Sequence, residues 1–510
     1  MKKFCKMNVL LLTAAVICLV SGGSALGADG DRTLNLSILA PLTTIDPQAS
    51  TNLQDWMFFR QVFEPLYHQN EATSKYEPRV AESYSISPDN LVYTFKIRKG
   101  IKFHNGADLK ASDVVFSYKR ALEQPKVRSY LGGVKNVSAG DDYTVKVELS
   151  APNAAFLNNQ TRVMILSQKE VEEQGGEFGT KLTLAGTGPY YLTSLKHDVE
   201  WTCSAFPDYY RGEAPIKKLH YTPIVEASAG LIAFESGELD WYIAPIANWD
   251  ALTSNPAYKT QLVPANHISF IALNYEHKPL DDDNIRMAIA YAIDKDAMNI
   301  ACYDGHAQNA DFMVQPQSNA GAPSKGLVYN YDPEKAKEYV KKSAYPNGTN
   351  VGTINCSAGG YFEKMAQVLQ SNLADVGLTC DINRLDSATN MEQARHQKFD
   401  LFCSGTDCNG DFDFYKRYSY SKAVGTYYVK YEGTKFDYKK LDALWDAGIA
   451  TTDPAEREKI YSEVSDFIAA TATMFPVFHK VQPYVWTPDL TIPVNYPNYP
   501  QVYEWSWTKK

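Results

Sequence analysis

The stretch from Asp283 to Lys295, D283-N-I-R-M-A-I-A-Y-A-I-D-K295, decides how the chain is divided. Acidic residues at 281–283 are suited to cap the start of a helix, and they favour the positive end of its dipole. Apolar residues then recur at the spacing that forms one face of an amphipathic helix. They are Ile285, Ala288, Ile289, Ala292 and Ile293. We therefore predict a packing helix over 283–295.

This helix follows a β-rich run, H267-I-S-F-I-A-L-N-Y-E276, and precedes segments that alternate between strand and helix patterns. Those segments are Val351–Cys356, Phe362–Val376, Leu378–Ile382 and Phe399–Cys403. A strand, a helix and a strand of these lengths predict a right-handed parallel crossover. The change of pattern thus predicts a second body of α/β type, with a cleft between it and the first.

A polar loop, C403-S-G-T-D-C-N-G-D-F-D-F414, follows the last of these strands. Open α/β sheets usually bind ligands at the carboxyl ends of their strands. Three interpretations of the loop stay open: a solvated acidic loop, a metal site, or an anionic pocket for a cationic ligand group. The loop lacks the repeated ligand spacing of a calcium loop or of paired C-x-x-C motifs. A ligand ammonium would supply the positive partner that a buried carboxylate needs.

Residues 75–188 have the pattern of a separate α+β unit. Alternating apolar residues predict strands at 91–97 and 143–149, and Ser112 is a candidate cap for a helix between them. The glycines and proline of G186-T-G-P-Y190 predict an irregular bend that ends the unit. The tail P476-V-F-H-K-V-Q-P-Y-V-W486 is strand-like again, and we expect it to cross back to the first body.

The N-terminus has the pattern of a secretion signal, which we place at 1–27. Three lysines precede an apolar core that is short for a membrane span, and Ala25-Leu26-Gly27 offers small residues for cleavage. Lipoprotein processing at Cys18 is the alternative, and the bulky Ile17 before it disfavours that route. We expect a periplasmic or extracellular protein.

Charge and motif content exclude several function classes. The chain has a formal charge of −9, or −12 without the three lysines of the leader, which argues against nucleic acid or an anionic membrane as the main partner. The nine histidines show no tight metal-ligand spacing. Ser419 and Lys422 match a lone S-x-x-K motif, but no second motif supports a hydrolase. We predict no enzyme activity, no metal and no cofactor.

Six cysteines remain after the leader, and export would allow them to form disulfides. Cys403 and Cys408 are close enough in sequence to close a small loop. Cys356 and Cys380 lie in two runs with the pattern of neighbouring strands. Both pairs are candidate disulfides, and free, mostly buried thiols are the alternative.

Several further stretches occur in a fixed order along the chain. They are T44-I-D-P47; Y93-T-F-K-I-R-K-G-I-K-F-H-N-G-A-D-L-K-A-S-D-V-V-F116; G186-T-G-P-Y190; D208-Y-Y-R-G-E-A-P215; S236-G-E-L-D240; and 283–295. Together they resemble the extracellular solute-binding proteins of peptide-type ABC importers (family 5), and most of all the oligopeptide- and dipeptide-binding proteins. The resemblance runs from about residue 34 to the C-terminus. Each stretch alone is weak, and their common order makes the resemblance specific.

The resemblance implies an α/β fold of the type II periplasmic-binding-protein class, with two lobes joined by two crossing segments. It places lobe 1 at 33–74, 189–268 and 484–510, an inserted domain at 75–188, and lobe 2 at 269–483. It also implies a monomeric substrate-binding component that captures oligopeptides or dipeptides in the cleft and delivers them to the membrane permease subunits of an ABC importer. A nickel chelate, haem, an opine or an oligosaccharide is the alternative ligand.

Peptide binders of this family use an aspartate after a G-W strand end to pair with the peptide α-amino group. The corresponding segment here is S404-G-T-D-C-N-G-D411, in which Thr406 lies near the tryptophan position and Asn409 falls on the aspartate. The resemblance makes Asp411 the first candidate for this role and Asp407 the second. Further candidates for ligand contact are Cys403, at the position of an arginine in some relatives, and Leu42, Thr43, Tyr361 and His479.

Overall fold

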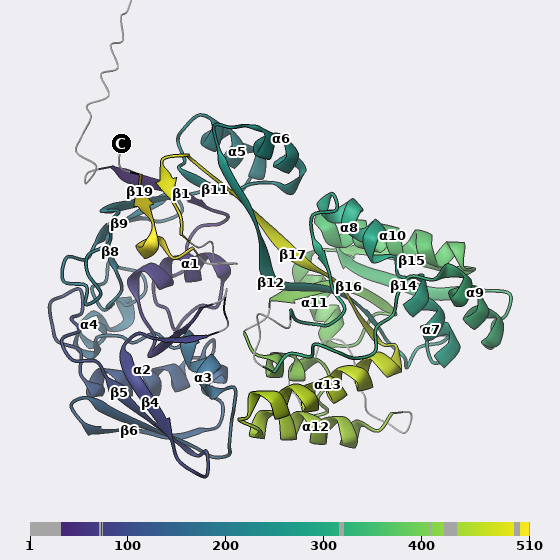
Figure 1. Ribbon diagram of the computed structural model, residues 1–510, viewed down its shortest axis with the longest axis horizontal. Helices are drawn as coiled ribbons and strands as arrows, with labels where there is room; N and C mark the ends of the chain where they lie inside the picture. The colour runs from purple at the N-terminus through teal and green to yellow at the C-terminus, as the bar shows by residue number, and fades with distance from the viewer. Residues whose placement is uncertain are drawn as a thin grey trace, which may run out of the picture.

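The protein consists of two bodies that lie side by side and are joined by two long strands (Figure 1). These strands are β12 (Lys259–Leu273) and β17 (Met474–Trp486). The structure is a computed structural model that describes residues 32–70, 73, 75–315, 321–407, 410–422, 436–493 and 500–508. The leader expected at 1–27, with Cys18, lies outside the described residues, as do Cys408 and Asn409.

One mixed sheet passes through both bodies in the order β15-β14-β16-β12-β17-β11-β1-β10-β9-β8. The strands of the first body are β1 (Thr33–Ile38), β8 (Tyr190–Lys196), β9 (Glu200–Ala205), β10 (Lys218–Pro223) and β11 (Trp241–Ile243). Those of the second body are β14 (Thr349–Ser357), β15 (Leu378–Leu385) and β16 (Leu401–Asp407), and the short β13 (Gln308–Asn309) pairs with β17. The two long strands therefore form the centre of the sheet.

The pairing of the two long strands changes register where they pass from one body to the other. Pro264 pairs with Val481 and Ile268 pairs with His479, so three residues of β12 lie opposite the single residue Lys480. A bulge of this kind bends the strand and increases its twist. The bulge lies close to the boundaries expected at 268–269 and 483–484, and the division into lobes stays a prediction.

The core of the first body lies between its strands and α1 (Leu53–Val62). Trp56 and Phe58 of α1 are buried there, and the ring of Trp201 stacks on Tyr221 with 3.7 Å between centroids. Two short helices, α5 (Ala227–Glu235) and α6 (Trp249–Ser254), cover a smaller cluster beside β11. A small sheet of β18 (Leu490–Thr491) and β19 (Ser506–Trp507) brings the C-terminal segment back to this body.

Most of the 75–188 region packs around a core at Phe95, Val114 and Val145, which Leu66 and Tyr67 also join. Its last part, from Met164 to Ala185, packs instead into the core of the first body, and the bounds of the unit stay a prediction. Its antiparallel sheet has the order β4-β5-β7-β6, with β4 (Ala81–Ile86), β5 (Val92–Ile97), β6 (Val134–Asp141) and β7 (Thr144–Leu149). Its helices are α2 (Ala111–Glu123), α3 (Phe156–Asn159) and α4 (Gln168–Gln174). The strands expected at 91–97 and 143–149 are confirmed. The expected cap is wrong: α2 begins before Ser112, and Asp113 accepts from the backbone of Lys110.

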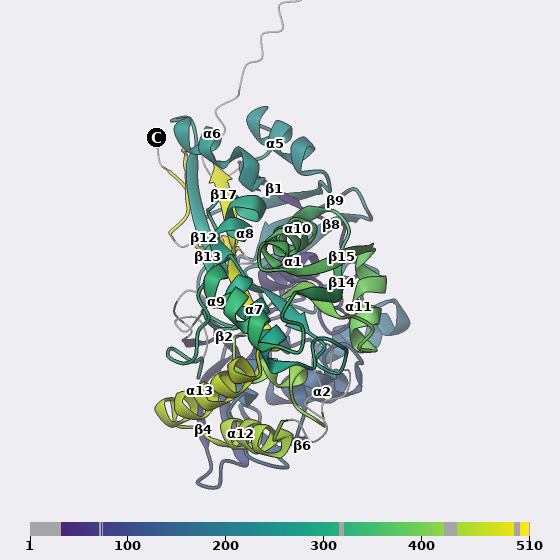
Figure 2. The same ribbon diagram turned by 90° about the vertical axis from the view of Figure 1, so that its right-hand side faces the viewer.

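The sheet of the second body carries a hydrophobic core on each face, because side chains alternate along its strands. One core contains Cys403 and is covered by α7 (Asp283–Ala292), α8 (Lys295–Tyr303), α9 (Pro333–Lys342) and α10 (Gly360–Asp375). The other contains Phe402 and is covered by α11 (Ser387–Arg395), α12 (Tyr438–Ala450) and α13 (Pro454–Thr471). In Figure 2, α9 and α11 lie on opposite sides of β14 and β15. The latter strands pair in parallel, as predicted.

The stretch 283–295 does not form one helix. Its apolar face is buried as predicted, and Asp282 accepts from the backbone N–H of Asn284 at 2.8 Å. However, α7 ends at Ala292, where Ile293 turns to extended backbone. The Asp294 side chain then accepts from the Ala297 N–H at 2.9 Å and begins α8. Asp294, which lies inside the single helix predicted over 283–295, is therefore the N-cap of a second helix.

The candidate disulfide between Cys356 and Cys380 is absent, and both residues are buried free thiols. The parallel register pairs Cys356 with Arg384, four residues beyond Cys380 on β15. At about 3.3 Å per residue, this offset separates the two Cα atoms by far more than the roughly 4.4–6.8 Å that a disulfide spans. Cys403 is also a buried free thiol, and its candidate partner Cys408 is not among the described residues.

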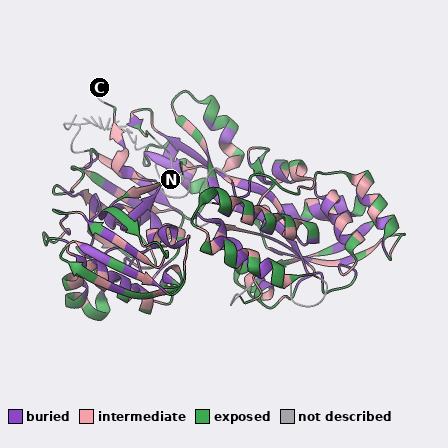
Figure 3. Cartoon of the chain, turned by 60° about the horizontal axis from the view of Figure 1, so that its bottom comes forward, coloured by how far each residue is buried: buried purple, intermediate pink, exposed green. Residues whose placement is uncertain are grey.

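Burial follows this layered arrangement (Figure 3). Buried residues follow the strands of the large sheet, whereas exposed residues lie on the outward faces of the helices and along β4 and β6. Among the residues that the structure describes, no helix combines the length and the apolar character needed to cross a bilayer.

Candidate ligand-binding site between the two bodies

Away from the crossing strands, the two bodies are joined by an ion-pair contact of 3.5 Å between His306 and Asp250 of α6, and by two hydrogen bonds on the side of α3 and α12. The Gln69 side chain, on β2 (Tyr67–Gln69), donates to the carbonyl of Gly410 in the second body at 3.2 Å. The Ala154 N–H donates to the carbonyl of Ile449 at 2.8 Å. Figure 1 shows the corresponding elements, α3 and α12, facing each other. The residues between these two hydrogen bonds and the strand crossing form the inner faces of the two bodies.

A three-residue polar cluster lies on the inner face of the second body, at the end of β16. Asp407 pairs with His267 across β16 and β12, and its Oδ1 lies 2.9 Å from His267 Nδ1. The other ring nitrogen, Nε2, lies 3.0 Å from the hydroxyl of Tyr361 at the start of α10. Gly405 makes room for this ring, because a Cβ there would lie 2.4 Å from His267 Nε2. Two strands and a helix therefore fix the imidazole in place.

Asp407 is ionised, and its carboxylate is exposed. Its side chain is 63% exposed although it lies at the meeting point of the bodies. Partial burial opposes its ionisation, but the hydrogen bond from His267 and the charges of Lys480 and Arg162 outweigh that effect and hold the pKa of Asp407 below its usual value. Arg162 belongs to the 3-10 turn η2 (Gln160–Arg162) of the first body. The carboxylate thus lies in the field of positive groups from both bodies.

Lys480 is the residue of β17 that lies opposite the bulge. Its side chain is partly buried, and burial lowers the pKa of its ammonium while the charge of Asp407 opposes that shift. Within the described part of the chain, Lys480 forms no ion pair closer than 4.0 Å. Asp407 and Lys480 together present one negative and one positive group, an arrangement suited to a zwitterion. We refer to Asp407, His267, Tyr361, Lys480 and Arg162 as the inter-body site.

Asp411 has a different partner from the ligand ammonium that we expected. Its side chain is buried, and its two oxygens receive hydrogen bonds from Arg457 of α13 at 2.6 and 2.8 Å. Asp411 also accepts from the Asp413 N–H at 2.9 Å and thereby begins the 3-10 turn η6 (Phe412–Tyr418). This carboxylate is saturated by protein groups, so the positive partner that its burial requires comes from Arg457.

Asp413, two residues later, makes the stability of this part of the chain depend on pH. Burial, and then the charge of Asp411, raise the pKa of Asp413 to about 6. This folded-state pKa lies above the unfolded value of about 3.9. Protonation of Asp413 therefore stabilises the folded protein fully below about pH 3.9, and this stabilisation is lost as the pH rises through about 6. Between pH 4 and pH 8 we expect the free energy of unfolding of wild type to fall by about 1–3 kcal/mol relative to that of Asp413→Asn. Urea unfolding of both proteins measures this difference, and a pH-independent difference would contradict it.

Three other candidate ligand-contact residues, on β16 and β17, make contacts within the protein. Thr406 Oγ1 accepts from the Tyr418 hydroxyl at 2.8 Å. Cys403 points into the core of the second body, where burial raises the pKa of its thiol. His479 is 5% exposed, and burial lowers the pKa of its imidazole to about 4, so the ring is neutral at physiological pH. Of these, Thr406 and His479 lie beside the inter-body site, and His479 forms a hydrogen bond with the backbone of His267.

Thr43 and Leu42, the two candidate ligand-contact residues in the first body, instead stabilise a loop of that body. The backbone N–H of Thr43 donates to Asp55 Oδ1 at 2.8 Å, and its hydroxyl donates to the other oxygen of the same carboxylate. Leu42 packs against the core of the first body. These contacts hold the 41–50 loop against α1.

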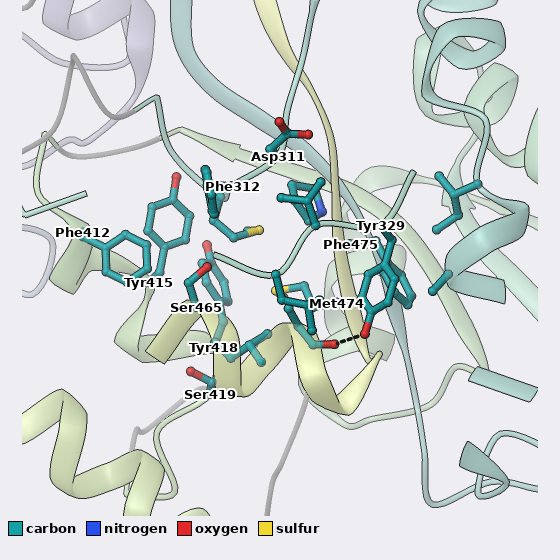
Figure 4. A pocket seen from close by; sticks show the side chains of 18 of the residues that line it. Asp311, Phe312, Tyr329, Phe412, Tyr415, Tyr418, Ser419, Ser465, Met474 and Phe475 are labelled. Atoms are coloured by element: carbon teal, nitrogen blue, oxygen red, sulfur yellow. Dashed lines mark hydrogen bonds between the residues drawn. The ribbon is translucent and has the colours of Figure 1, made fainter. Parts of the chain in front are cut away.

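A largely apolar cavity lies within the second body, lined by residues of η6, α13 and the start of β17 among others (Figure 4). Figure 4 shows Tyr415, Tyr418, Met474 and Phe475 around it, with the Tyr329 hydroxyl donating to the Ala469 carbonyl at 2.9 Å. Tyr418 lines the cavity and also contacts Thr406, so the cavity lies on the face of β16 that carries Thr406, opposite to the face that carries Asp407. No group of three or more His, Cys, Asp or Glu side chains in the described ranges is arranged to hold a metal ion.

Sequence reasoning missed His267, Lys480 and Arg162. His267 opens the quoted strand 267–276, but a strand pattern does not show that its first side chain is held by a carboxylate. Lys480 follows the candidate His479, and strand alternation places these neighbours on opposite faces, which is the signal that favours Lys480. No local signal identifies Arg162, because its approach to Asp407 depends on how the bodies meet.

Comparison with known proteins supports a single family. The model for bacterial extracellular solute-binding proteins, family 5 (middle), matches residues 75–426. Heme-binding protein A of Haemophilus influenzae is 27% identical over 456 residues, which cover 83% of this chain and 82% of that protein. Glutathione-binding protein GsiB of Escherichia coli K12 is 25% identical over 454 residues, which cover 85% and 86%. The solved structure of HbpA2 from Haemophilus parasuis has a TM-score of 0.82 at 24% identity, covering 93% of this chain and 100% of that one.

The structural neighbours confirm the predicted type II periplasmic-binding-protein fold. The family model matches more than half of the chain, in a region that includes the inserted unit, β12 and the end of β16. Proteins of this family work outside the cytoplasmic membrane and supply small solutes to permeases. The chain belongs to the bacterial extracellular solute-binding proteins, family 5, of ABC importers.

Proposed function

We propose that this protein captures short peptides between its two bodies and delivers them to the membrane permease subunits of an ABC importer. The observation that carries this proposal is the inter-body site, where an exposed, ionised Asp407 lies among the positive charges of Lys480 and Arg162. A peptide with free ends is a zwitterion that offers a matching partner to each sign of charge. We further propose that the chain is exported by the leader at 1–27 and binds its ligand as a monomer, without catalysis.

In this proposal Asp407 replaces Asp411 as the residue that receives the peptide α-ammonium. Asp407 is fixed by His267 and remains mostly exposed, whereas Asp411 is buried against Arg457. Lys480 lies close enough for its charge to act on Asp407, and it is suited to receive a carbonyl or carboxylate of the peptide. Closure of the bodies over the peptide would then bring Arg162 toward the same ligand.

Gly410 is important for this closed arrangement. Its φ is +80°, and a Cβ there would lie 2.0 Å from Gln69 Oε1 and 2.8 Å from Asn158 Oδ1, both in the first body. We expect Gly410→Ala to displace the Gln69 side chain, to break its hydrogen bond to the carbonyl of residue 410, and to weaken binding of Ala-Ala-Ala on the order of tenfold. Gly100→Ala is the matched control, since Gly100 has a φ of +79° and nothing within 4 Å of its Cβ position. Equal affinities of the two variants in calorimetry would contradict this role.

A non-peptide solute is the second candidate ligand. The named relatives bind haem and glutathione, and structural neighbours were solved with a peptide, with agropinic acid and with Ni(L-His). An exported hydrolase is a weaker alternative, because the hydroxyl that the His267–Asp407 pair holds is the phenol of Tyr361, whose pKa is raised by burial, and a phenol is not the serine or cysteine nucleophile of such enzymes. Within the family, the mixed charges of the site favour a ligand that carries both an ammonium and a carboxylate.

Native mass spectrometry of the protein, purified without unfolding, separates these ligands. We expect a distribution of bound masses that fragment as short peptides. A single discrete non-peptide mass would contradict the peptide proposal while leaving the binding function intact. Turnover of a peptide library by the same preparation would favour the hydrolase.

A further inference from the structure

Two buried cysteines lie next to each other on neighbouring strands of the second body. Strands β14 and β16 run in parallel, and the last residues that they pair are Asn355 and Phe402. The next residue on each strand is a cysteine, Cys356 on β14 and Cys403 on β16. Continuing the register by one residue therefore places the two cysteines side by side.

Both cysteine side chains point to the same face of the sheet. Cys356 and Cys403 are each 0% exposed, and both belong to the core that α8 and α10 cover. Phe402 belongs to the core on the opposite face, as strand alternation requires. Adjacent strands are separated by about 4.7–4.9 Å, which is within the roughly 4.4–6.8 Å between Cα atoms that a disulfide spans. The offset that excludes a bridge from Cys356 to Cys380 is absent from this pair.

The Cys356 thiol can turn toward its neighbour at little cost. Its Sγ lies 3.9 Å from the carbonyl oxygen of Asn383 on β15, a long contact for a hydrogen bond from sulfur. Because β14 lies between β15 and β16, rotation about the Cα–Cβ bond directs this thiol toward Cys403 instead. A third thiol of the same core, that of Cys302 on α8, donates to the Tyr361 carbonyl at 3.3 Å. Cys356 is therefore the better partner for Cys403.

Burial decides when these two thiols can react. It raises the pKa of Cys356 to about 11 and the pKa of Cys403 well above its usual value. The thiolate is the form that attacks a disulfide, so both thiols react slowly in the folded protein. Before the strands pack, solvent reaches both thiols. The pair is therefore open to oxidation while the chain folds and is protected from it afterwards.

We propose that Cys356 and Cys403 form a disulfide when the chain folds in an oxidising compartment, where disulfides persist. Each thiol gives up its proton and one S–S bond forms. The two electrons reduce the S–S bond of a small-molecule or protein disulfide, which takes up the two protons as two thiols. The source of this oxidant rests on the proposed export of the chain, whereas the pairing itself does not.

The bridge would fasten β14 to β16 just beyond their last paired residues. Asp407 lies four residues further along β16, on the strand face that also carries Cys403. The disulfide would therefore anchor the strand that ends in the inter-body site, without contacting the ligand.

Refolding of the denatured, reduced protein with oxidised glutathione tests the pairing in the absence of any export. After the remaining thiols are alkylated and the chain is cut with trypsin, we expect one linked pair of peptides, 343–364 with 399–416. The first contains Cys356 and the second contains Cys403. Protein that is already folded and reduced should form the link on the order of tenfold more slowly. Equal rates would overturn formation during folding.

Cys408→Ser makes the assignment unique, because residues 399–416 also contain Cys408. This variant leaves Cys403 as the one thiol of that peptide, and we expect the link to persist. Loss of the link in Cys408→Ser would overturn the proposal. So would a wild-type bridge within 399–416, linkage of either peptide to a different cysteine peptide, or the absence of any linked peptides.

Thermal unfolding provides a second readout that does not depend on peptide mapping. Reductant should lower the melting temperature of the bridged wild type on the order of 10 °C, because the bridge restrains a long loop of the unfolded chain. Cys380→Ala is the control, since it removes a thiol of the same core and should keep the effect of reductant. Cys356→Ala should abolish that effect. An effect of reductant that persists in Cys356→Ala would overturn the pairing.

Discussion

Asp411→Asn should destabilise the second body by about 3–5 kcal/mol, because it leaves the buried Arg457 without its counter-charge. The two side chains are 3% and 4% exposed and are joined by two hydrogen bonds of 2.6 and 2.8 Å. The amide keeps the shape of the carboxylate but cannot accept both guanidinium bonds or balance the charge. Urea unfolding followed by tryptophan fluorescence measures the loss, with Trp445 packed beside this pair through Tyr461.

Asp283→Asn is the matched control for this effect. Arg286 is also buried and also pairs with an aspartate, but Asp283 is 72% exposed. Arg286 keeps two backbone carbonyls as partners, those of Thr471 at 2.9 Å and Leu280 at 2.8 Å. We expect this control to cost less than about 1 kcal/mol. Similar costs for the two variants, or a loss of peptide binding by Asp411→Asn without destabilisation, would contradict the structural role of Asp411.

Asp407→Asn should weaken binding of Ala-Ala-Ala by about 10–100-fold, because it removes the charge that holds the α-ammonium. The same variant should bind N-acetyl-Ala-Ala-Ala no worse than wild type does, since that probe carries no ammonium. Calorimetry with both probes measures the selectivity. The pair of probes separates loss of the ion pair from a general distortion of the site, which would weaken both.

Asp400→Asn controls for damage to the strands. Asp400 precedes β16 and contacts a histidine in the same way as Asp407, with 2.8 Å between its Oδ1 and His277 Nδ1. This pair lies at the opposite end of β16 from the inter-body site. We expect Asp400→Asn to leave the preference for the free amino terminus unchanged. A loss of that preference in both variants, or in neither, would show that Asp407 is not the ammonium site.

The fold was largely predictable because it depends on local patterns in a fixed order. Strand alternation marked β5 and β7, and the order of short motifs indicated the two-lobed class. The break between α7 and α8 was not predictable from apolar spacing, because Ile293 continues the buried face although its backbone is extended. Only the capping bond from Ala297 to Asp294 decides that break.

The site was less predictable because its charges come from distant parts of the chain. Asp411 and Asp407 look alike in the sequence, four residues apart in one polar loop. Their roles separate only when Arg457 pairs with the first and His267 with the second. The positive charge of Arg162 reaches Asp407 only after the two bodies meet, and no local pattern encodes that approach.

Hydrogen–deuterium exchange with and without saturating Ala-Ala-Ala tests most directly whether the ligand lies between the bodies. We predict slower exchange in two segments at once: the end of β16 up to Asp407 in the second body, and η2 with Arg162 in the first. The outer strands β4 and β6 of the inserted unit serve as an internal reference and should not change. Protection confined to one body, or protection in neither segment while the peptide is bound, would contradict capture between the two bodies.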